Sequence, residues 1–347
     1  MAQSPSNAPP PSGRSAHPAA ANPTRRTVLR TIGGLVATGS IGTAVYGSVA
    51  SGSSGDDLRA SATIIAPAAA GGGWDAVARA LQQAQRANGI INNAQVVNMP
   101  GAGGTIALGN VGRLTGNAHT LLVGGTGLLA ATVQYDSPVA FTDITPLATI
   151  VEEYDVIAVP ADSPHTTLDE LIAAWQKAPR SVPFSGGGSF DQLVVTDLAL
   201  KNGIAGADIN YISSDGGGEV IQALLNGTVQ AAANGLPDTL DQIEAGRVRA
   251  LALVSEKPVS GIDIPTTVEL GHDVTLTNWR SISAPAGITA EQKAELTAII
   301  QETLNTPEWL DAEKTYAWAP ARRYGAELDE FLAQQTTRIN ELYQEMA

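Results

Sequence analysis

Runs with strand character alternate with helical patterns along the chain after residue 60. Each strand-type run is short and rich in apolar or β-branched residues, and each helical pattern repeats its apolar residues on one face. The expected strands are residues 62–67, 94–97, 120–124, 155–159, 182–184, 209–212, 229–233, 250–254 and 275–284. The expected helices are residues 75–88, 105–114, 167–177, 190–201, 218–226, 236–245, 289–304, 306–314 and 325–343. This alternation predicts an α/β fold in which parallel-type sheets are flanked by crossover helices.

The same alternation of strands and helices starts again half-way along the chain, and this repetition predicts two lobes. A domain core rarely grows beyond roughly 250–300 residues, and this chain has 347. We expect lobe 1 to comprise residues 60–159 and 280–347, and lobe 2 to comprise residues 160–279. A late extended segment returns to the first lobe, so the two crossings between the lobes would lie near residues 156–162 and 278–285.

Glycine clusters stand where the expected strands give way to helices. They are residues 71–75, 101–105, 124–127, 185–189 and 215–218, with a further candidate at residues 234–235. In an open parallel sheet these junctions lie at the carboxyl ends of the strands, where ligands bind. Glycine lets a backbone approach a ligand closely, and helix N-termini present free N–H groups. Tight turns alone also use glycine, but clusters at successive junctions favour an anion site built from backbone amides.

Other kinds of site are poorly supported by the sequence. Residues 125–130 have the shape of a dinucleotide fingerprint, but the acidic residue expected about 20 positions later is missing. The chain has no cysteine, no phosphate-binding loop lysine and no nucleophile elbow, and His119, His165 and His272 are scattered singly. We therefore expect a binding protein rather than an enzyme, with no catalytic residues, no metal and no cofactor.

The chain is acidic, with a formal net charge of −14 at pH 7. The first 50 residues hold four arginines and no acid, so the negative charge is concentrated in the rest of the chain. A negative surface repels nucleic acid and anionic membranes. We therefore expect no nucleic-acid partner.

The N-terminal 50 residues are typical of an export signal. A Pro/Ala/Ser-rich stretch precedes Arg25 and Arg26, and a weakly apolar run follows as far as Val49. Paired arginines before such a run resemble a twin-arginine signal, and residues 48–50 suit signal peptidase. The alternative is retention as a membrane anchor, which the many Gly, Ser and Thr residues of the run disfavour. We expect an extracytoplasmic protein, periplasmic or otherwise secreted, that is not a lipoprotein because no cysteine can carry the lipid.

Several segments together resemble one family. They are AGGGWDAVAR at residues 70–79, NMPGAGGT at 98–105, EYDVIAVP at 153–160, GGGE at 216–219, EAGRVRAL at 244–251, PTT at 265–267, NWR at 278–280 and APAGI at 284–288. This combination is similar to the substrate-binding proteins of tripartite tricarboxylate transporters, also called Bug receptors. The likeness covers residues 60–345, essentially all of the chain after the signal.

The resemblance implies a two-lobed periplasmic-binding-protein fold of type II with a ligand cleft between the lobes. It also implies a small organic carboxylate as ligand, either a dicarboxylate or a citrate-like tricarboxylate. The partner would be an ion-driven membrane permease, and we expect the receptor to act as a monomer. A sensor that presents the ligand to a membrane signalling partner remains open, because transport and sensing both use closure of the lobes.

The resemblance and the glycine clusters together predict the residues that contact the ligand. In this prediction residues 71–75 and 101–105 hold a carboxylate from lobe 1, and the loops at 185–189 and 215–218 close from lobe 2. The full set is Gly71, Gly72, Gly73, Trp74, Asp75, Gly101, Ala102, Gly103, Gly104, Thr105, Thr126, Gly127, Ser185, Gly187, Gly188, Ser189, Gln192, Asp215, Gly216, Gly217, Asn234 and Arg280.

Two positions depart from the family pattern. Gln192 stands where relatives often have a histidine, and Ser281 stands where the tryptophan–arginine pair is usually followed by glycine. Arg280 itself has two interpretations. Its planar fork can bind a ligand carboxylate at two points, or it can pair with an acid at the hinge while Trp279 packs between the lobes.

Overall fold

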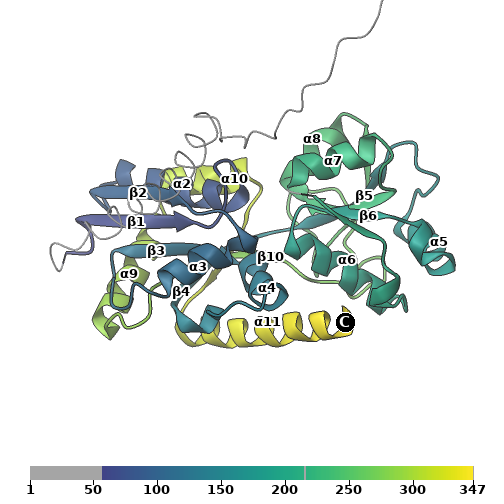
Figure 1. Ribbon diagram of the computed structural model, residues 1–347. Coiled ribbons are helices and arrows are strands. Elements are labelled where there is room, and N and C mark those ends of the chain that lie inside the picture. The colour runs from purple at the N-terminus through teal and green to yellow at the C-terminus, as the bar shows by residue number, and fades with distance from the viewer. Residues whose placement is uncertain (1–56, 215, 347) are drawn as a thin grey trace, which may run out of the picture. The chain divides into compact units, whose positions relative to one another are not determined.

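The computed structural model describes residues 57–214 and 216–346, and the structural statements below concern these residues (Figure 1). Their helices and strands form two β-sheets with helices packed against them. The expected twin-arginine signal within residues 1–50 lies outside the described residues, and so does the predicted ligand residue Asp215.

Strands from both ends of the described chain build the first sheet, in the order β11-β4-β10-β3-β1-β2. They are β1 Ser61–Ala66, β2 Asn93–Asn98, β3 Thr120–Gly125, β4 Thr145–Glu153, β10 Asn278–Ala284 and β11 Ala319–Arg323. β1 pairs in parallel with β2 and β3, whereas β10 is antiparallel to β3 and β4, and β11 is antiparallel to β4. The sheet is therefore mixed, and its parallel half comes from the first three strands of the chain.

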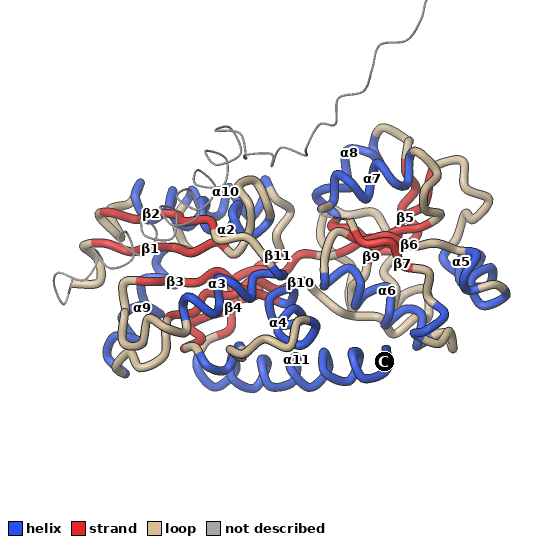
Figure 2. Tube along the Cα trace, viewed as in Figure 1, coloured by secondary structure: helices blue, strands red, loops and turns tan. Residues whose placement is uncertain are grey.

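The second sheet has the order β7-β6-β8-β5-β9. Its strands are β5 Asp155–Pro160, β6 Phe184–Gly186, β7 Tyr211–Ser213, β8 Ala231–Gly235 and β9 Val248–Leu253. β6 pairs in parallel with β7 and β8, and β5 is antiparallel to β8 and β9. Each sheet thus has a parallel part made of three strands and an antiparallel part that adjoins it. Figure 2 shows the strands of both sheets in red and the helices around them in blue.

The α-helices mostly follow the predicted ranges. They are α2 Gly73–Ala87, α3 Thr105–Val111, α4 Thr126–Gln134, α5 Leu168–Lys177, α6 Ser189–Lys201, α7 Gly217–Leu225, α8 Leu236–Glu244, α9 Ala290–Thr303, α10 Pro307–Thr315 and α11 Gly325–Met346. Short 3-10 turns lie at Ala102–Gly104, Phe141–Asp143, Pro179–Ser181 and Gly206–Asp208. Across the two described ranges, none of the helices has both the length and the apolar character that a membrane span requires.

The expected α/β fold is confirmed, but α4, β4 and β11 were not foreseen. β4 leads into β5 with only Tyr154 between them, whereas the alternation predicts a helix after each strand. α4 begins inside a glycine cluster, and its buried residues include the consecutive run 128–131, so no single apolar face marks it as a helix. β11 contains Pro320 and two arginines, which hide its strand character.

Two boundaries in the sequence prediction need correction. Residues 155–159 were expected in lobe 1, but strand β5 pairs with β8 and β9 in the second sheet. The chain leaves the first sheet at the end of β4, so the first crossing lies at Tyr154, just before the expected range of 156–162. The chain returns to the first sheet where β10 begins, at Asn278, so residues 278 and 279, which were expected in lobe 2, belong to the first sheet.

The C-terminal helix α11 touches parts of both sheets' helical layers. It packs against α4 and β4 on the first-sheet side and against α6 on the second-sheet side. Trp279 of β10 is fully buried and lies edge-on against Phe141 and against Phe331 of α11, with ring centroids 5.9 and 5.6 Å apart. Trp279 therefore packs between the first sheet and α11, the helix that also contacts α6, and its packing between the lobes stays a prediction.

Candidate functional site

The helices differ in how their N-termini are capped. α5, α9 and α10 start after threonines, whose hydroxyls accept a backbone N–H of the first turn. Six other helices start after a glycine with no side-chain cap, namely α2 after Gly72, α3 after Gly104, α4 after Gly125, α6 after Gly188, α7 after Gly216 and α8 after Gly235. A glycine cap leaves first-turn N–H groups without a side-chain partner at the positive end of the helix dipole.

All six glycine-capped helices follow strands from the parallel parts of the sheets. α2, α3 and α4 come after β1, β2 and β3, while α6, α7 and α8 come after β6, β7 and β8. Neighbouring parallel strands end at the same edge of a sheet, which is where such folds bind ligands. Three glycine-capped N-termini therefore gather at one edge of each sheet, as the glycine clusters predict.

On the first-sheet side, the predicted loops meet around Trp74. A Cβ added at Gly104 or at Gly127 would lie 3.4 Å from the Trp74 ring, and the Arg280 guanidinium lies 5.9 Å from the ring centroid. A Cβ at Gly73 would lie 2.8 Å from Arg280 Nη2. The structure therefore brings together five of the predicted residues from four separate segments.

On the second-sheet side, the loop after β6 lies directly against the loop after β7. A Cβ added at Gly187 would lie 2.8 Å from the carbonyl carbon of Gly216 and 3.0 Å from the backbone nitrogen of Gly217. A Cβ at Gly217 would overlap the carboxylate of Asp238, on the first turn of α8. These glycines let the backbones of two loops approach each other and let the Asp238 side chain pack against one of them.

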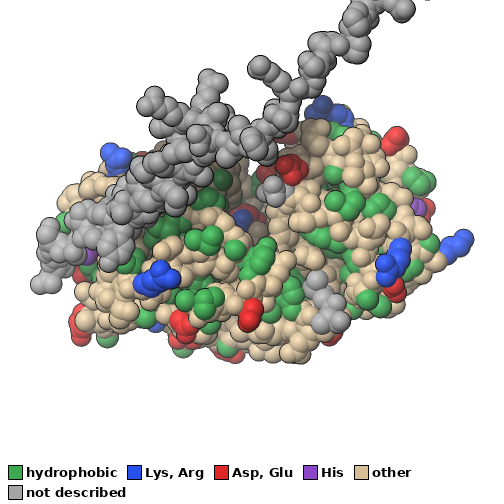
Figure 3. All heavy atoms as spheres, viewed as in Figure 1, with side chains coloured by type: hydrophobic (Ala, Val, Ile, Leu, Met, Phe, Trp, Pro, Cys, Tyr) green, Lys and Arg blue, Asp and Glu red, His purple; other side chains and the backbone are tan. Residues whose placement is uncertain are grey.

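The two groups of loops touch at Ser189. Its hydroxyl donates a hydrogen bond to Oε1 of Gln134, on α4, at 2.5 Å. A Cβ added at Gly103 would lie 3.7 Å from the Ser189 hydroxyl and 2.5 Å from the Ala131 side chain. Figure 3 shows this face of the molecule hollowed between the first-sheet and second-sheet parts, with acidic and basic side chains visible inside the hollow.

Three predicted polar residues are buried and bonded within the protein. Thr126 donates its hydroxyl to the carbonyl oxygen of Thr277 at 2.8 Å and accepts the N–H of Trp279 at 3.0 Å. Ser185 donates to a carbonyl oxygen of β7 at 2.8 Å, and Asn234 donates to the hydroxyl of Thr239 at 2.9 Å. Their side chains hold the loops in position.

Asp75 braces the first glycine loop. Its carboxylate accepts hydrogen bonds from the Gly71 N–H at 2.8 Å, from Arg79 at 2.9 Å and from Asn98 at 2.8 Å. Burial acts to raise the pKa of Asp75, but these hydrogen bonds outweigh it and hold the pKa below its usual value. Asp75 is therefore a charged, fully paired carboxylate that fixes the loop.

Arg280 forms a two-point ion pair with Glu153. Its Nε lies 3.0 Å from one carboxylate oxygen, and its Nη2 contacts the other. Both side chains are largely buried, at 8% and 13% exposure. Arg280 therefore pairs with an acid, as the hinge interpretation predicts, and its contact with a ligand remains a proposal.

The remaining predicted residues lie at the loop tips. Gly101 and Ala102 are exposed, and the Thr105 hydroxyl donates to the carbonyl oxygen of Ala102 at 2.9 Å. Gly188 is exposed, and Gln192 is partly exposed in the first turn of α6.

Three acidic residues near Arg280 were not predicted from the sequence. Asp155 opens β5, Asp191 lies in the first turn of α6, and Asp238 lies in the first turn of α8. Desolvation raises the pKa of Asp155 well above its usual range, and the charges of Asp191 and Glu153 raise it further. Desolvation also raises the pKa of Asp238 and takes that of Asp191 to about 7. One signal was available, since Asp191 follows Gly187 at the same interval as Asp75 follows Gly71.

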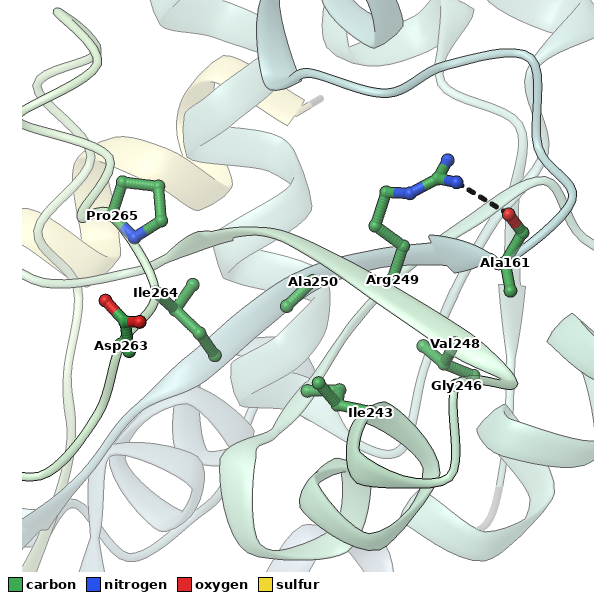
Figure 4. A pocket seen from close by; sticks show the side chains of 9 residues that line it. All are labelled: Ala161, Ile243, Gly246, Val248, Arg249, Ala250, Asp263, Ile264 and Pro265. Atoms are coloured by element: carbon green, nitrogen blue, oxygen red, sulfur yellow. Dashed lines mark hydrogen bonds between the residues drawn. The ribbon is translucent and has the colours of Figure 1, made fainter.

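A separate cavity of about 400 Å³ opens on the second-sheet part of the molecule (Figure 4). It lies between the end of α8, strand β9 and residues 263–265. Arg249 at its rim donates to the carbonyl oxygen of Ala161 at 2.7 Å and so anchors the loop after β5. No predicted ligand residue lines this cavity, whose lining is mostly apolar and backbone.

Comparison with known proteins identifies the family. A sequence model of the tripartite tricarboxylate transporter family receptor matches residues 77–347. The chain belongs to this receptor family. The expected family is thus confirmed, and its members are transport receptors that bind solutes. Protein BugT of Bordetella pertussis is 28% identical to this receptor over 257 residues, which cover 72% of this chain and 78% of BugT.

Solved structures agree on the fold. The periplasmic binding protein BugD superposes with a TM-score of 0.71 at 24% identity, covering 83% of this receptor and 98% of BugD. MatC from Rhodopseudomonas palustris, solved with bound malate, has a TM-score of 0.70 at 22% identity and covers 81% and 98% of the two chains. An R. palustris protein solved with adipate has a TM-score of 0.72 at 20% identity, with coverage of 82% and 97%. The two-lobed receptor fold expected from the sequence is confirmed.

Proposed function

We propose that this receptor captures a small organic carboxylate between its two sheets and delivers it to a tripartite tricarboxylate permease. The carboxylate binds to the first-turn N–H groups of the glycine-capped helices. The loops at residues 71–75 and 101–105 hold it from the first sheet, and the loops at 185–189 and 215–218 close over it. Dicarboxylates and citrate-like tricarboxylates are the ligands that the family resemblance favours.

The gathering of six glycine-capped N-termini at the sheet edges carries this proposal. Such termini bind anions through backbone N–H groups and the helix dipole without needing a lysine. Gly188 and Gly216 add a second argument. Both have extended backbones near φ 170°, and a Cβ at either would have no neighbour within 4 Å. The described structure needs no glycine at these positions, so we assign their glycines to ligand contact or closure.

The family relatives support the same ligand class. Two solved proteins with the same fold are described with malate and with adipate, both of which are dicarboxylates. We carry this to the present receptor as part of the proposal, together with an ion-driven permease as its partner.

The location of the protein and its division into lobes belong to the same proposal. The receptor is exported by the twin-arginine pathway, is not a lipoprotein and acts as a monomer outside the cytoplasm. Each lobe is built on one of the two sheets, and the chain crosses between them at Tyr154 and just before Asn278. Closure about these two crossings traps the ligand.

A thermal-shift screen against about thirty organic acids tests the proposal, since a ligand at 100 times its Kd stabilises a protein by about 2.7 kcal/mol. Hits are then measured by calorimetry with Gly188→Ala. This variant should fold normally and lose at least about tenfold in affinity, because a methyl group enters the space of the ligand or the closing loop. Gly109→Ala is the control, since a Cβ there also meets nothing but Gly109 lies within α3, away from the loops. Absence of any binding acid would refute the function, and equal affinity of Gly188→Ala and Gly109→Ala would refute the amide cradle.

A further inference from the structure

The carboxylates around the candidate site are not balanced by cations. Asp75 pairs with Arg79, and Glu153 pairs with Arg280. Among the described residues, Asp155, Asp191 and Asp238 form no ion pair. The charge of Arg280 lowers the pKa of each from a longer distance, but all three pKa values stay above the ordinary value. The second-sheet side of the site therefore holds three acidic groups without a counter-charge, and a ligand made only of carboxylates would bring them none.

Asp155 is the most unusual of these acids. It is 2% exposed, and its Oδ2 is buried with no hydrogen-bond partner among the described residues. The partly buried Tyr211 hydroxyl, whose pKa is raised by burial and by the charges of Asp191 and Asp155, also lacks a partner. Buried carboxylate oxygens are almost always hydrogen-bonded in native proteins, because leaving one unpaired is costly. An unpaired oxygen at a candidate ligand site is therefore explained most directly by a donor that arrives with the ligand.

The three acids come from three elements that converge on the second-sheet loops. Asp191 accepts the Gly187 N–H at 2.5 Å, and Asp238 lies against Gly217. In the strand register Asp155 lies opposite Gly235, and a Cβ added at Gly235 would lie 3.7 Å from Asp238 Oδ2. Asp191 is close enough for its charge to raise the pKa of Asp155, so the three carboxyls face a common region. Across residues 57–214 and 216–346, no three acidic or histidine side chains lie close enough to hold one metal ion.

Asp75 and Asp191 hold equivalent positions in their loops, but only Asp75 has a cationic partner. Both carboxylates accept the N–H of the residue four positions earlier, at the start of a glycine loop. Asp75 has Arg79 one helical turn further on, whereas Val195 occupies the corresponding place after Asp191. The same loop brace is thus paired with a cation in the first-sheet loop and has no ion-pair partner among the described residues in the second-sheet loop.

We propose that the ligand is zwitterionic, with a carboxylate at the glycine-capped helices and a protonated amine among Asp155, Asp191 and Asp238. This inference rests on the proposed function and narrows its ligand class to amino acids and related amino-carboxylates. The amine donates to the free Oδ2 of Asp155, and the charge of the acids excludes ligands that carry a second carboxylate in its place.

Matched ligand pairs test the inference on the purified full chain by calorimetry. One pair is malate and aspartate, which differ by a hydroxyl or an ammonium on the same carbon. The other pair is adipate and 6-aminohexanoate, which differ by a carboxylate or an ammonium at the far end. The remaining acids of the screen are each paired with an amino counterpart. We expect the tightest ligand of the panel to be an amine, at least tenfold tighter than its amine-free partner.

Two variants link that preference to the acids. Asp155→Asn and Asp238→Asn should each reduce the affinity for the amine at least tenfold and leave the amine-free partner unchanged or tighter. Asp241→Asn, on the same helix as Asp238, should change neither. Affinity for the amine should also rise from pH 5 to pH 8, because Asp191 with its pKa of about 7 must lose its proton. Glu153, Arg280 and Tyr211 also face these acids, but the first two stay paired with each other, and Tyr211 stays protonated over this range.

The outcomes separate this inference from the function on which it rests. One outcome is that only amine-free ligands bind, or that they bind more tightly than the amines and lose affinity as pH rises. The three aspartic acids would then act as neutral hydrogen-bond donors. The zwitterionic ligand would be wrong, but the proposed capture of a carboxylate would stand. If no member of any pair binds, both proposals fail. If an amine binds best but Asp155→Asn and Asp238→Asn bind it like the wild type, the assigned amine site is wrong.

Discussion

Arg280 of β10 and Glu153 at the end of β4 form a two-point ion pair where the chain leaves the first sheet. Glu153 lies opposite Asn278 in the antiparallel register, so Arg280 reaches it along one face of the paired strands. Asp155 follows only two residues later and begins the second sheet. The pair therefore ties the returning strand to the crossing, beside the Trp74 ring and the glycine loops.

Breaking this pair should destabilise the protein. Glu153→Gln leaves the largely buried guanidinium without its counter-charge, and removing one partner of a buried pair costs about 3–5 kcal/mol. We expect urea denaturation to show a loss toward the lower end of this range, because both groups keep slight solvent access. The double variant Glu153→Gln/Arg280→Met should recover much of the loss. A double variant no more stable than Glu153→Gln would argue that the charge pair is not the cause.

The same variant tests whether Arg280 can bind a ligand carboxylate. In Glu153→Gln the guanidinium loses its bidentate partner and is free to offer its fork to an anion. If Arg280 contacts the ligand, calorimetry should show a gain of at least about threefold in affinity for a carboxylate, roughly 0.6 kcal/mol. Unchanged affinity would assign Arg280 to the hinge alone.

Glycine substitutions should divide into structural and functional classes. A Cβ at Gly125 would overlap the carbonyl oxygen of Trp279, where β3 and β10 pair. Gly103 has φ 59° and would press a Cβ against Ala131. We expect Gly125→Ala and Gly103→Ala to lower the melting temperature clearly, Gly125→Ala more, because its obstacle is backbone. Neither is a clean probe of ligand contact. Gly188→Ala and the control Gly109→Ala should melt close to the wild type, and a large loss in either would contradict this division.

Stability should fall as pH rises through the acidic range at the candidate site. Folded Asp191 has its pKa raised from an ordinary 3.8 to about 7, so the folded state binds the proton more tightly than the unfolded chain does. The resulting stability is fully present below about pH 4 and is lost between about pH 4 and pH 7. Asp155 and Asp238 act in the same direction, because their pKa values are also raised.

Asp238→Asn isolates that effect by scanning calorimetry. The melting temperature of the variant relative to wild type should be higher at pH 8 than at pH 5, because one repelling charge has been removed. Asp241→Asn is the matched control and should show no such trend. A difference that stays constant between pH 5 and pH 8 would contradict the raised pKa of Asp238.

Export should depend on the arginine pair of the N-terminal segment. Changing Arg25 and Arg26 together to lysine keeps the charge but removes the residues that the twin-arginine pathway reads. We expect the double variant to stay in the cytoplasm, as measured by cell fractionation, and Arg14→Lys to be exported normally. Normal export of the double variant would rule out this pathway.

Local patterns in the sequence determined the elements and the loops of this protein. Strand and helix periodicity located most elements, because burial on one face imposes that period wherever the element packs. The helix expected from residue 167 begins as α5 in a capping box, with the Glu170 N–H 3.2 Å from the Thr167 hydroxyl. The glycine clusters located the edge of each sheet at which the glycine-capped helices begin, because close approach of backbones favours glycine at those positions.

Only the tertiary structure decided which charges face each other. Asp155, Asp191 and Asp238 are far apart in the chain, and their desolvation depends on loops packing together from three strands. From the sequence, Arg280 could bind a ligand or pair with an acid. The register of β10 against β4 places Glu153 within hydrogen-bonding distance of it. The sheet that β5 joins was also undecided, because a short apolar run pairs with any available edge. Periodicity and capping act within a few residues, whereas ion pairing and desolvation depend on distances that only the folded chain defines.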